Sequence, residues 1–548
     1  MQKHMTLWTT LFIIFCGAAW AGAGQKEQAD RHYNEGITAF KNGNLDKAIQ
    51  EFQRATELNN TDHVAFCWLG FTYMKKGQTT EAIRHFTRAL QLDPKYALAH
   101  NNLGTAYWEV GKALQASGQK DKAAEEFNKA VASYEQAVAL RPDYAEARFN
   151  LASAYLEMGR YKDAIQHFLR VVDQLRKQLQ AKPADPSLRD SLAQAYYGLG
   201  QAYESIDPNH MAEAIGAYSK ARDMNAQDEN YQLAFGLALY REARFKDAIA
   251  PLKEALRLNS HLASARLALG MCYLKTNNYR AAQKELESYT KLASDDADGW
   301  FRLGYAYDQE GKYEDALKAY QRAVELKQRT VEGNPQASPA ERTTYAGYLN
   351  NIGRVYFKQT RWDEAIEQFE KALEVSKDFR PALNNLALSY HRKASEQQEQ
   401  GSTEEARQTF GQAEKVWLRL RDLDRNNVTV LGALADTQMA QDKVDEAKAT
   451  YQQLLRIDPK NVPALSNLGL LCFRQNPPDL KSAADYFEQV IRLNPNNPIA
   501  YNNLGVVREQ QGKLAEAEQL YKKALQLKPD YKDAQDNLRR IKGGPQQG

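Results

Sequence analysis

The strongest constraint on this chain is an internal period of 34 residues. Residues 63–96 and 498–531 align without a gap, and both carry the series aromatic-x-x-Leu-Gly, a turn Gly, Ala-x-x-x-aromatic and Ala-Leu-x-Leu-x-Pro. Self-similarity at a period of this size indicates stacked repeats. We therefore expect one continuous array, although 548 residues would otherwise suggest three or four globular domains.

The period extends over thirteen units, which begin near residues 29, 63, 97, 145, 184, 229, 263, 297, 338, 380, 428, 462 and 498. The first half of each unit has a small residue: Gly36, Gly70, Gly104, Ala152, Gly200, Gly236, Gly270, Gly304, Gly353, Ala387, Ala435, Gly469 and Gly505. The second half has an Ala in all thirteen units, and a large apolar residue follows it four positions later. Small residues let two helices approach closely, and a large side chain one turn on fills the space between them.

These residues resemble the tetratricopeptide repeat family, a helix-turn-helix unit of 34 residues. The resemblance implies an all-α fold, a right-handed superhelical solenoid over residues 29–531. Residues 22–28 are expected to be a linker before the array, residues 532–542 a polar capping helix, and residues 543–548 a disordered tail.

Helices are expected to be longer than usual in two regions, near residues 105–200 and 325–420. The units that begin near residues 97 and 380 each contain 14 additional residues, seven per helix, or about two turns, which keeps the apolar stripe in phase. Between units, Asp185-Pro186 and Ser338-Pro339 read as helix starts, the latter with a capping box. The longer helices are interpreted either as architecture alone or as ridges that shape a docking surface.

Residues 1–21 have the three parts of a secretory signal peptide. Lys3 and His4 precede an apolar stretch, and Ala19-Trp20-Ala21 is a small-x-small cleavage site. The stretch is shorter than the roughly 20 residues that a spanning helix needs. We expect cleavage after Ala21 and export, to a bacterial periplasm, with no integral membrane span afterwards. The alternative is an inner-membrane anchor formed by residues 5–21.

Composition and motifs argue against catalysis and against nucleic-acid binding. Lys and Arg total 72 against 69 Asp and Glu, so the net charge is only +3. Cys67, Cys272 and Cys472 are far apart and fit neither a disulfide framework nor a zinc motif. No catalytic motif is present, and no metal or cofactor site is expected. His85 and His167, at one repeat position, are expected to face solvent.

Binding residues are expected along the first helices, which in this family line the concave surface. Two positions before the small residue, seven units carry Asn: Asn34, Asn102, Asn150, Asn351, Asn385, Asn467 and Asn503. An Asn amide both donates and accepts, so a ladder of them could hold the backbone of an extended peptide. Asn is also common at this position throughout the family, so the pattern has a second explanation. The Lys/Asn clamp of chaperone-docking repeats is absent.

These observations predict a non-enzymatic scaffold that binds proteins or extended peptides in the cell envelope. A second hypothesis is a scaffold for an assembly that exports or modifies a polysaccharide. Aromatic side chains exposed in the groove would favour this second function. Neither the partner nor the oligomeric state follows from the sequence.

Overall fold

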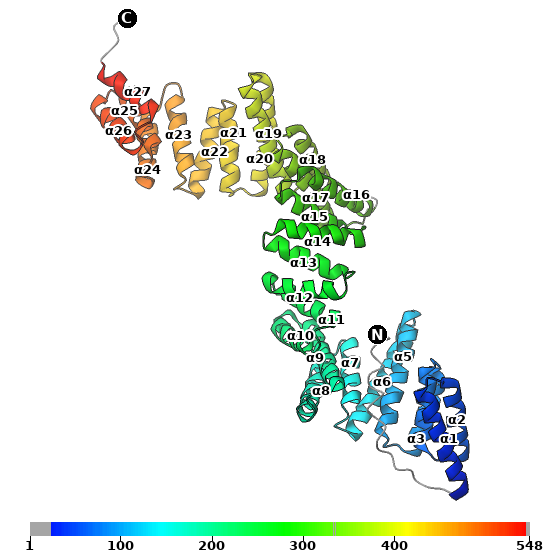
Figure 1. Ribbon diagram of the computed structural model, residues 1–548. Helices are drawn as coiled ribbons and strands as arrows, with labels where there is room; N and C mark the ends of the chain where they lie inside the picture. The colour runs from blue at the N-terminus through cyan, green and yellow to red at the C-terminus, as the bar shows by residue number, and fades with distance from the viewer. Residues whose placement is uncertain (1–22, 333, 335, 544–548) are drawn as a thin grey trace. The chain divides into compact units, whose positions relative to one another are not determined.

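The structure, a computed structural model, describes residues 23–332, 334 and 336–543. Within these residues every regular element is helical, so the predicted all-α class is confirmed (Figure 1). The chain divides into two units, the first ending at Leu292 and the second beginning at Ala293. The predicted signal peptide and residues 544–548 of the predicted tail lie outside the described residues.

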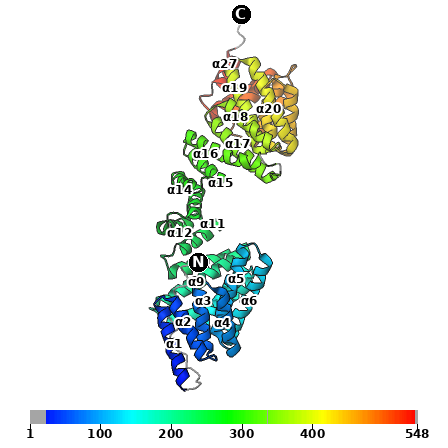
Figure 2. The same cartoon turned by 90° about the vertical axis from the view of Figure 1, so that its right-hand side faces the viewer.

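The first unit is a stack of seven antiparallel helix pairs, and α1 to α6 lie side by side in chain order (Figure 2). Its helices are α1 (Ala23–Lys41), α2 (Leu45–Leu58), α3 (His63–Lys75), α4 (Thr79–Leu92), α5 (Ala97–Ala116), α6 (Lys120–Leu140), α7 (Ala145–Glu157), α8 (Tyr161–Ala181), α9 (Pro186–Ile206), α10 (Met211–Met224), α11 (Glu229–Arg241), α12 (Phe245–Leu258), α13 (Ala263–Lys275) and α14 (Tyr279–Leu292). A short 3-10 helix, η3 (Pro208–His210), joins α9 to α10.

The second unit contains six further pairs and a final helix that packs on α26 and α25. Its helices are α15 (Ala297–Gln309), α16 (Tyr313–Val331), α17 (Pro339–Lys358), α18 (Trp362–Val375), α19 (Arg380–Glu399), α20 (Thr403–Leu423), α21 (Val428–Ala440), α22 (Val444–Ile457), α23 (Val462–Arg474), α24 (Leu480–Leu493), α25 (Pro498–Gln510), α26 (Leu514–Leu527) and α27 (Lys532–Lys542).

Each pair closes around the predicted small residue of its first helix. A Cβ atom added to Gly200 on α9 would lie 2.6 Å from two ring carbons of Tyr218 on α10. Tyr218 itself is only 1% exposed. The ring of the second helix therefore occupies the space that any larger residue at the small position would need, which explains the repeated pairing of small and large residues.

The loop before a first helix is fastened by a recurrent hydrogen bond. The residue four positions before the small one donates to a backbone carbonyl six residues upstream. In the described residues this bond joins His100 to Pro94 (3.0 Å), Arg148 to Pro142 (2.8 Å), Gln232 to Ala226 (3.1 Å), Arg266 to Ser260 (2.9 Å) and Trp300 to Ser294 (3.0 Å). In the final helix α27, Gln535 makes the equivalent bond to Pro529 (2.8 Å). Each accepting carbonyl belongs to the loop, two residues after the preceding helix ends, so the bond ties that loop to the next helix.

Helix lengths vary between pairs. The regular helices α3 and α4 have 13 and 14 residues, whereas α5 and α6 have 20 and 21, and α19 and α20 also have 20 and 21. At the start of α17, Ser338 and Glu341 form the capping box, with Pro339 at the first position. Asp185 caps α9 by accepting from the backbone N–H groups of Ser187 and Leu188.

Three expectations need correction or qualification. Residues 23–28 are not a linker, because they form the first turns of α1. His85 does not face solvent: its side chain is 12% exposed and stacks on Tyr73, with ring centroids 5.3 Å apart. Burial lowers the pKa of His85 to about 4. His167 is likewise half-buried, beside Tyr155. The three cysteines are buried, as small apolar residues usually are.

Candidate binding surface

The seven predicted Asn residues all lie on first helices, but most of their amides already have partners. Two of them, Asn150 and Asn385, donate to another Asn on the preceding first helix. Asn150 on α7 donates to the Oδ1 atom of Asn101 on α5 at 2.9 Å, and Asn385 on α19 donates to Asn350 on α17 at 2.8 Å. The acceptors Asn101 and Asn350 are 1% and 5% exposed, so these bonds are part of the packing between repeats.

Three further amides have partners of other kinds, and those of Asn102 and Asn467 lie in the preceding repeat. Asn102 is buried and approaches the Sγ atom of Cys67 at 3.7 Å. Asn351 donates to the carbonyl of Gly347 on its own helix at 2.8 Å. Asn467 donates to the Tyr451 hydroxyl at 2.7 Å. These contacts leave each side chain fewer free hydrogen-bonding groups than the sequence pattern suggests.

The remaining two amides are free of such bonds. Asn34 on α1 is exposed and Asn503 on α25 is half-buried, and neither side chain makes a hydrogen bond to another described residue. The structure thus separates the seven positions into amides that connect protein groups and amides that remain available. The sequence could not make this distinction, because the bonding partners lie in neighbouring repeats.

We expect Asn385→Ala to destabilise the second unit, since it removes the donor to a buried acceptor. The loss should be about 1–3 kcal/mol, because the Asn350 oxygen is left without its partner. Hydrogen exchange should accelerate in α17 to α20. Asn503→Ala is the matched control: it should leave exchange unchanged, since Ala is a better helix former than Asn and no side-chain hydrogen bond to a described residue is lost. Equal effects of the two substitutions would contradict this division.

Sequence reasoning missed an aromatic cluster formed by Phe40, Trp68 and Phe71. Trp68 on α3 occupies the position that Asn holds in other units. Its ring centroid lies 5.6 Å from that of Phe40 on α1 and 5.8 Å from that of Phe71, and all three side chains are half-buried. Large amphipathic rings that remain partly exposed on a shared face are typical anchors of binding surfaces. The sequence contains these residues but does not show their exposure.

Charged groups border the aromatic cluster. The Lys75 ammonium lies 5.2 Å from the Phe71 ring centroid, a cation–π distance. Burial lowers the pKa of Lys75, and the nearby Glu146 carboxylate opposes this shift. Burial raises the pKa of Glu146, whereas a hydrogen bond with Asn101 opposes that rise. The face formed by α3, α5 and α7 therefore has aromatic, cationic and carboxyl groups, the mixture that a protein or peptide partner needs.

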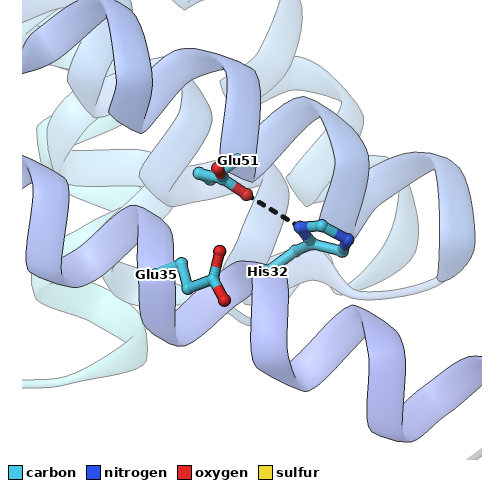
Figure 3. Close-up of side chains that lie close together, drawn as sticks. All are labelled: His32, Glu35 and Glu51. Atoms are coloured by element: carbon cyan, nitrogen blue, oxygen red, sulfur yellow. Dashed lines mark hydrogen bonds and ion pairs between the residues drawn. The ribbon is translucent and has the colours of Figure 1, made fainter.

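Near the start of the array, three side chains form a small polar cluster on α1 and α2. His32 Nδ1 and Glu51 Oε2 are 2.7 Å apart, and Glu35 lies one turn after His32 (Figure 3). One ligand atom from each residue falls within 4.8 Å of the others. Such a set could ligate a cation, but His32 is also the residue four positions before the small one, so its bond to Glu51 fastens α1 to α2.

The family of the chain follows from this architecture and from family models. Models described as "TPR repeat" match residues 36–77 and 72–111, and models described as "Tetratricopeptide repeat" match residues 121–182, 267–329, 344–419, 397–469 and 478–532. Residues 207–289 match a model described as "Anaphase-promoting complex, cyclosome, subunit 3". The chain belongs to the tetratricopeptide repeat proteins, which are generally non-catalytic scaffolds for protein–protein binding.

Individual relatives match the chain only in part or at low identity. Photosystem I assembly protein Ycf3 of Rippkaea orientalis is 29% identical over 79 residues, which are 14% of this chain; the chain thus spans about half, 46%, of that relative's length. Among solved structures, MamA of Desulfovibrio magneticus is 22% identical and covers 34% of this chain and 97% of its own, with a TM-score of 0.29. Yeast Tom70 is 16% identical and covers 83% and 99%, again with a TM-score of 0.29.

A third structure is that of YrrB, described as a TPR protein with an unusual peptide-binding site. It is 18% identical, covers 43% of this chain and 97% of its own, and has a TM-score of 0.29. These likenesses assign no partner to this chain. Among the described helices, none combines the length and the apolar character required to cross a membrane.

Proposed function

We propose that this protein is a non-enzymatic scaffold of the cell envelope that binds a protein partner through an extended peptide segment along its first helices. The observation that carries the proposal is the aromatic cluster on α1 and α3. Its residues Phe40, Trp68 and Phe71 are half-buried, and Lys75 lies beside it. Apolar rings supply binding energy by burial, and polar groups beside them fix the orientation of the ligand.

The proposed location is the bacterial periplasm. Its support is the sequence pattern of residues 1–21, which contains Lys3, a short apolar stretch and the Ala19-Trp20-Ala21 site. N-terminal sequencing of the protein from fractionated cells tests this part separately. A mature end at Gly22 in the periplasmic fraction supports export with cleavage, whereas an intact Met1 in the membrane fraction supports the anchor of residues 5–21.

A scaffold for a polysaccharide export or modification assembly is the second candidate. The half-buried aromatic cluster favours it, because aromatic rings can also stack on sugars. The two candidates differ in the partners that they require. Polymer synthases or outer-membrane export proteins bound to the chain would support the second, and unrelated envelope proteins would support the first.

The test combines capture of the partner with a titration of single variants. Proteins captured from the envelope by the full chain are identified by mass spectrometry, and the direct partner is then titrated calorimetrically. We expect Trp68→Ala to weaken binding about thirtyfold or more, since truncation of an aromatic anchor costs about 2 kcal/mol or more. Phe71→Ala should also weaken binding.

Leu514→Ala is the control for this titration. Leu514 is 54% exposed on the second helix α26, away from the first helices, so its truncation should leave the affinity unchanged. Circular dichroism and hydrogen exchange establish that Trp68→Ala remains folded, because Trp68 also lies against Phe52. If wild type and Trp68→Ala bind equally well, the aromatic cluster is not the binding surface.

A further inference from the structure

Three basic side chains of the fourth repeat, Arg148, His167 and Arg170, act on one another electrostatically. Arg148 is on α7, four positions before the small residue Ala152, and His167 and Arg170 are on α8. Burial lowers the pKa of His167, and so do the charges of Arg148 and Arg170. The charge of Arg170 also lowers the pKa of Arg148, after burial.

The second repeat shows how these positions meet. There Phe66 takes the place of Arg148, and His85 and Arg88 take the places of His167 and Arg170. The Phe66 ring centroid lies 6.2 Å from that of His85, and the Arg88 guanidinium carbon lies 5.8 Å from the Phe66 centroid. Both residues of the second helix thus contact the residue of the first. In the fourth repeat an arginine replaces the phenylalanine between them.

Two other repeats place a carboxylate where the fourth repeat has His167. Arg266 on α13 donates from Nη1 to Glu285 on α14 at 3.0 Å. His32 on α1 hydrogen-bonds Glu51 on α2 at 2.7 Å. A basic side chain on the first helix is therefore paired with an acid from the second helix in these repeats, and the fourth repeat keeps the basic side chain but not the acid.

Because the fourth repeat lacks this acid, part of the Arg148 guanidinium has no hydrogen-bond partner among the described residues. The residue is 6% exposed, and its Nη2 atom donates to the Pro142 carbonyl at 2.8 Å. Its Nη1 atom is buried and has no hydrogen-bond partner among the described residues, and the same holds for Nδ1 of His167. In Arg266 the Nη1 atom is the one that reaches the Glu285 carboxylate. A buried donor of this kind is costly unless something accepts from it.

The nearest acids do not supply that acceptor. Asp163 and Glu135 are the carboxylates that raise the pKa of His167, but both have other partners. Asp163 accepts from the Arg160 guanidinium at 2.8 Å, and Glu135 accepts from the Tyr155 hydroxyl. Arg170 is exposed, so the cluster is reached from solvent on the side of α8.

We propose that Arg148, His167 and Arg170 form a binding site for an oxyanion. A carboxylate or phosphate group there accepts from the Arg148 Nη1 donor and from the His167 Nδ1–H, and the Arg170 guanidinium pairs with it at the solvent side. Planar guanidinium donors suit both of these oxygen ligands. The source is either a free anion such as phosphate or an acidic side chain of a bound protein. The site is separate from the aromatic cluster and does not depend on the function proposed for it.

The direct test follows the imidazole NMR signals of the histidine-labelled full chain during titration with inorganic phosphate or sodium acetate, at fixed pH and ionic strength. The His167 signal should shift and saturate, whereas that of His85, which has Phe66 beside it, should not. Arg148→Met should weaken this binding about tenfold or more, since a hydrogen bond to a charged group is lost. A His167 signal unaffected by either anion, or equally affected in Arg148→Met, overturns the proposal.

The two anions distinguish the sources. Saturation by phosphate alone indicates a site for free phosphate, and saturation by acetate as well indicates that an acidic side chain can occupy it. A second variant keeps the test valid if Arg148→Met fails to fold. His167→Glu places a carboxylate where Glu285 stands beside Arg266; it should raise the Tm, and added phosphate should not raise the Tm of this variant further. A folded His167→Glu protein with a lower Tm overturns the proposal, and Glu285→His, as the mirror control, should lower the Tm.

Discussion

Gly200→Ala should destabilise the first unit, whereas Gly216→Ala should stabilise it, although both substitutions add one methyl group to neighbouring helices. The new Cβ at position 200 would lie 2.6 Å from ring carbons of Tyr218, and that ring is buried and hydrogen-bonded through its hydroxyl to Glu204. Overpacking of this kind costs about 1–3 kcal/mol. Nothing lies within 4 Å of the corresponding atom at position 216, so Ala there gains about 0.5–1 kcal/mol of helix stability.

Urea denaturation shows whether each substitution raises or lowers the free energy of unfolding, and hydrogen exchange shows which helices are affected. Each repeat contacts only its neighbours, so exchange in Gly200→Ala should accelerate mainly in α7 to α12. Unchanged protection in α1 and α2 is the internal control. A uniform loss of protection over the whole array would contradict the nearest-neighbour account, and destabilisation by Gly216→Ala would contradict the packing argument.

Glu414→Leu should lower the free energy of unfolding of the second unit. The Glu414 carboxylate on α20 is 8% exposed and accepts from the Gln438 and Gln441 amides, both at 3.1 Å, and from the Lys443 ammonium. Gln438 is itself buried, so removal of its acceptor leaves its amide donor unsatisfied, whereas the buried Gln441 amide still donates to the Thr437 carbonyl at 3.2 Å. One unsatisfied buried donor costs about 1–3 kcal/mol, which is the loss expected by urea denaturation. Glu414→Gln, which retains an acceptor oxygen, should cost less than Glu414→Leu.

The same carboxylate predicts a dependence on pH. Burial alone would raise the pKa of Glu414, but hydrogen bonds from Lys443, Gln438 and Gln441 outweigh it and hold the pKa below its usual value of 4.5. The resulting stabilisation is fully present above 4.5 and is lost as the pH falls through the lower value of the folded state. Denaturation midpoints of Glu414→Gln should therefore fall less between pH 6 and pH 3 than those of wild type. Parallel curves would show that Glu414 is not coupled to folding.

The sequence predicted the helix pairs because the period and the small-to-large spacing are local signals. Gly200 and Tyr218 are 18 residues apart within one unit, and their contact follows from the packing of two adjacent helices. The capping box at Ser338 could also be predicted from the sequence, since it depends on four consecutive residues. The exposure of His85 was predicted wrongly because its partners, Phe66 and Tyr73, belong to the other helix of the pair.

The candidate site was less accessible to prediction. The pattern located the Asn positions on the first helices, but Asn150 and Asn385 bond to residues 49 and 35 positions away in the preceding repeat. Spacing within one unit carries no information on such partners. The aromatic cluster was missed because Phe40 and Trp68 lie in different repeats, and only their packing shows how much of each ring remains outside the core.

The hydrogen bonds between Asn side chains of successive first helices, called amide bridges below, bear on how neighbouring repeats recognise one another. Every pair presents a small residue and a large side chain, so the apolar faces of different repeats are nearly interchangeable, and repeat proteins are prone to misassembly. The bridges are not interchangeable. The buried oxygens of Asn101, Asn350 and Asn502 receive the amides of Asn150, Asn385 and Asn537 in the next first helix.

A wrong neighbour at any of these three junctions would leave a buried carbonyl oxygen without a donor, at a cost of about 1–3 kcal/mol. A correct neighbour incurs no such cost. The amide bridges therefore favour the native neighbour over other repeats during folding, at the junctions of α5 with α7, α17 with α19 and α25 with α27. Apolar burial holds the array together, and these amide pairs determine which repeat follows which.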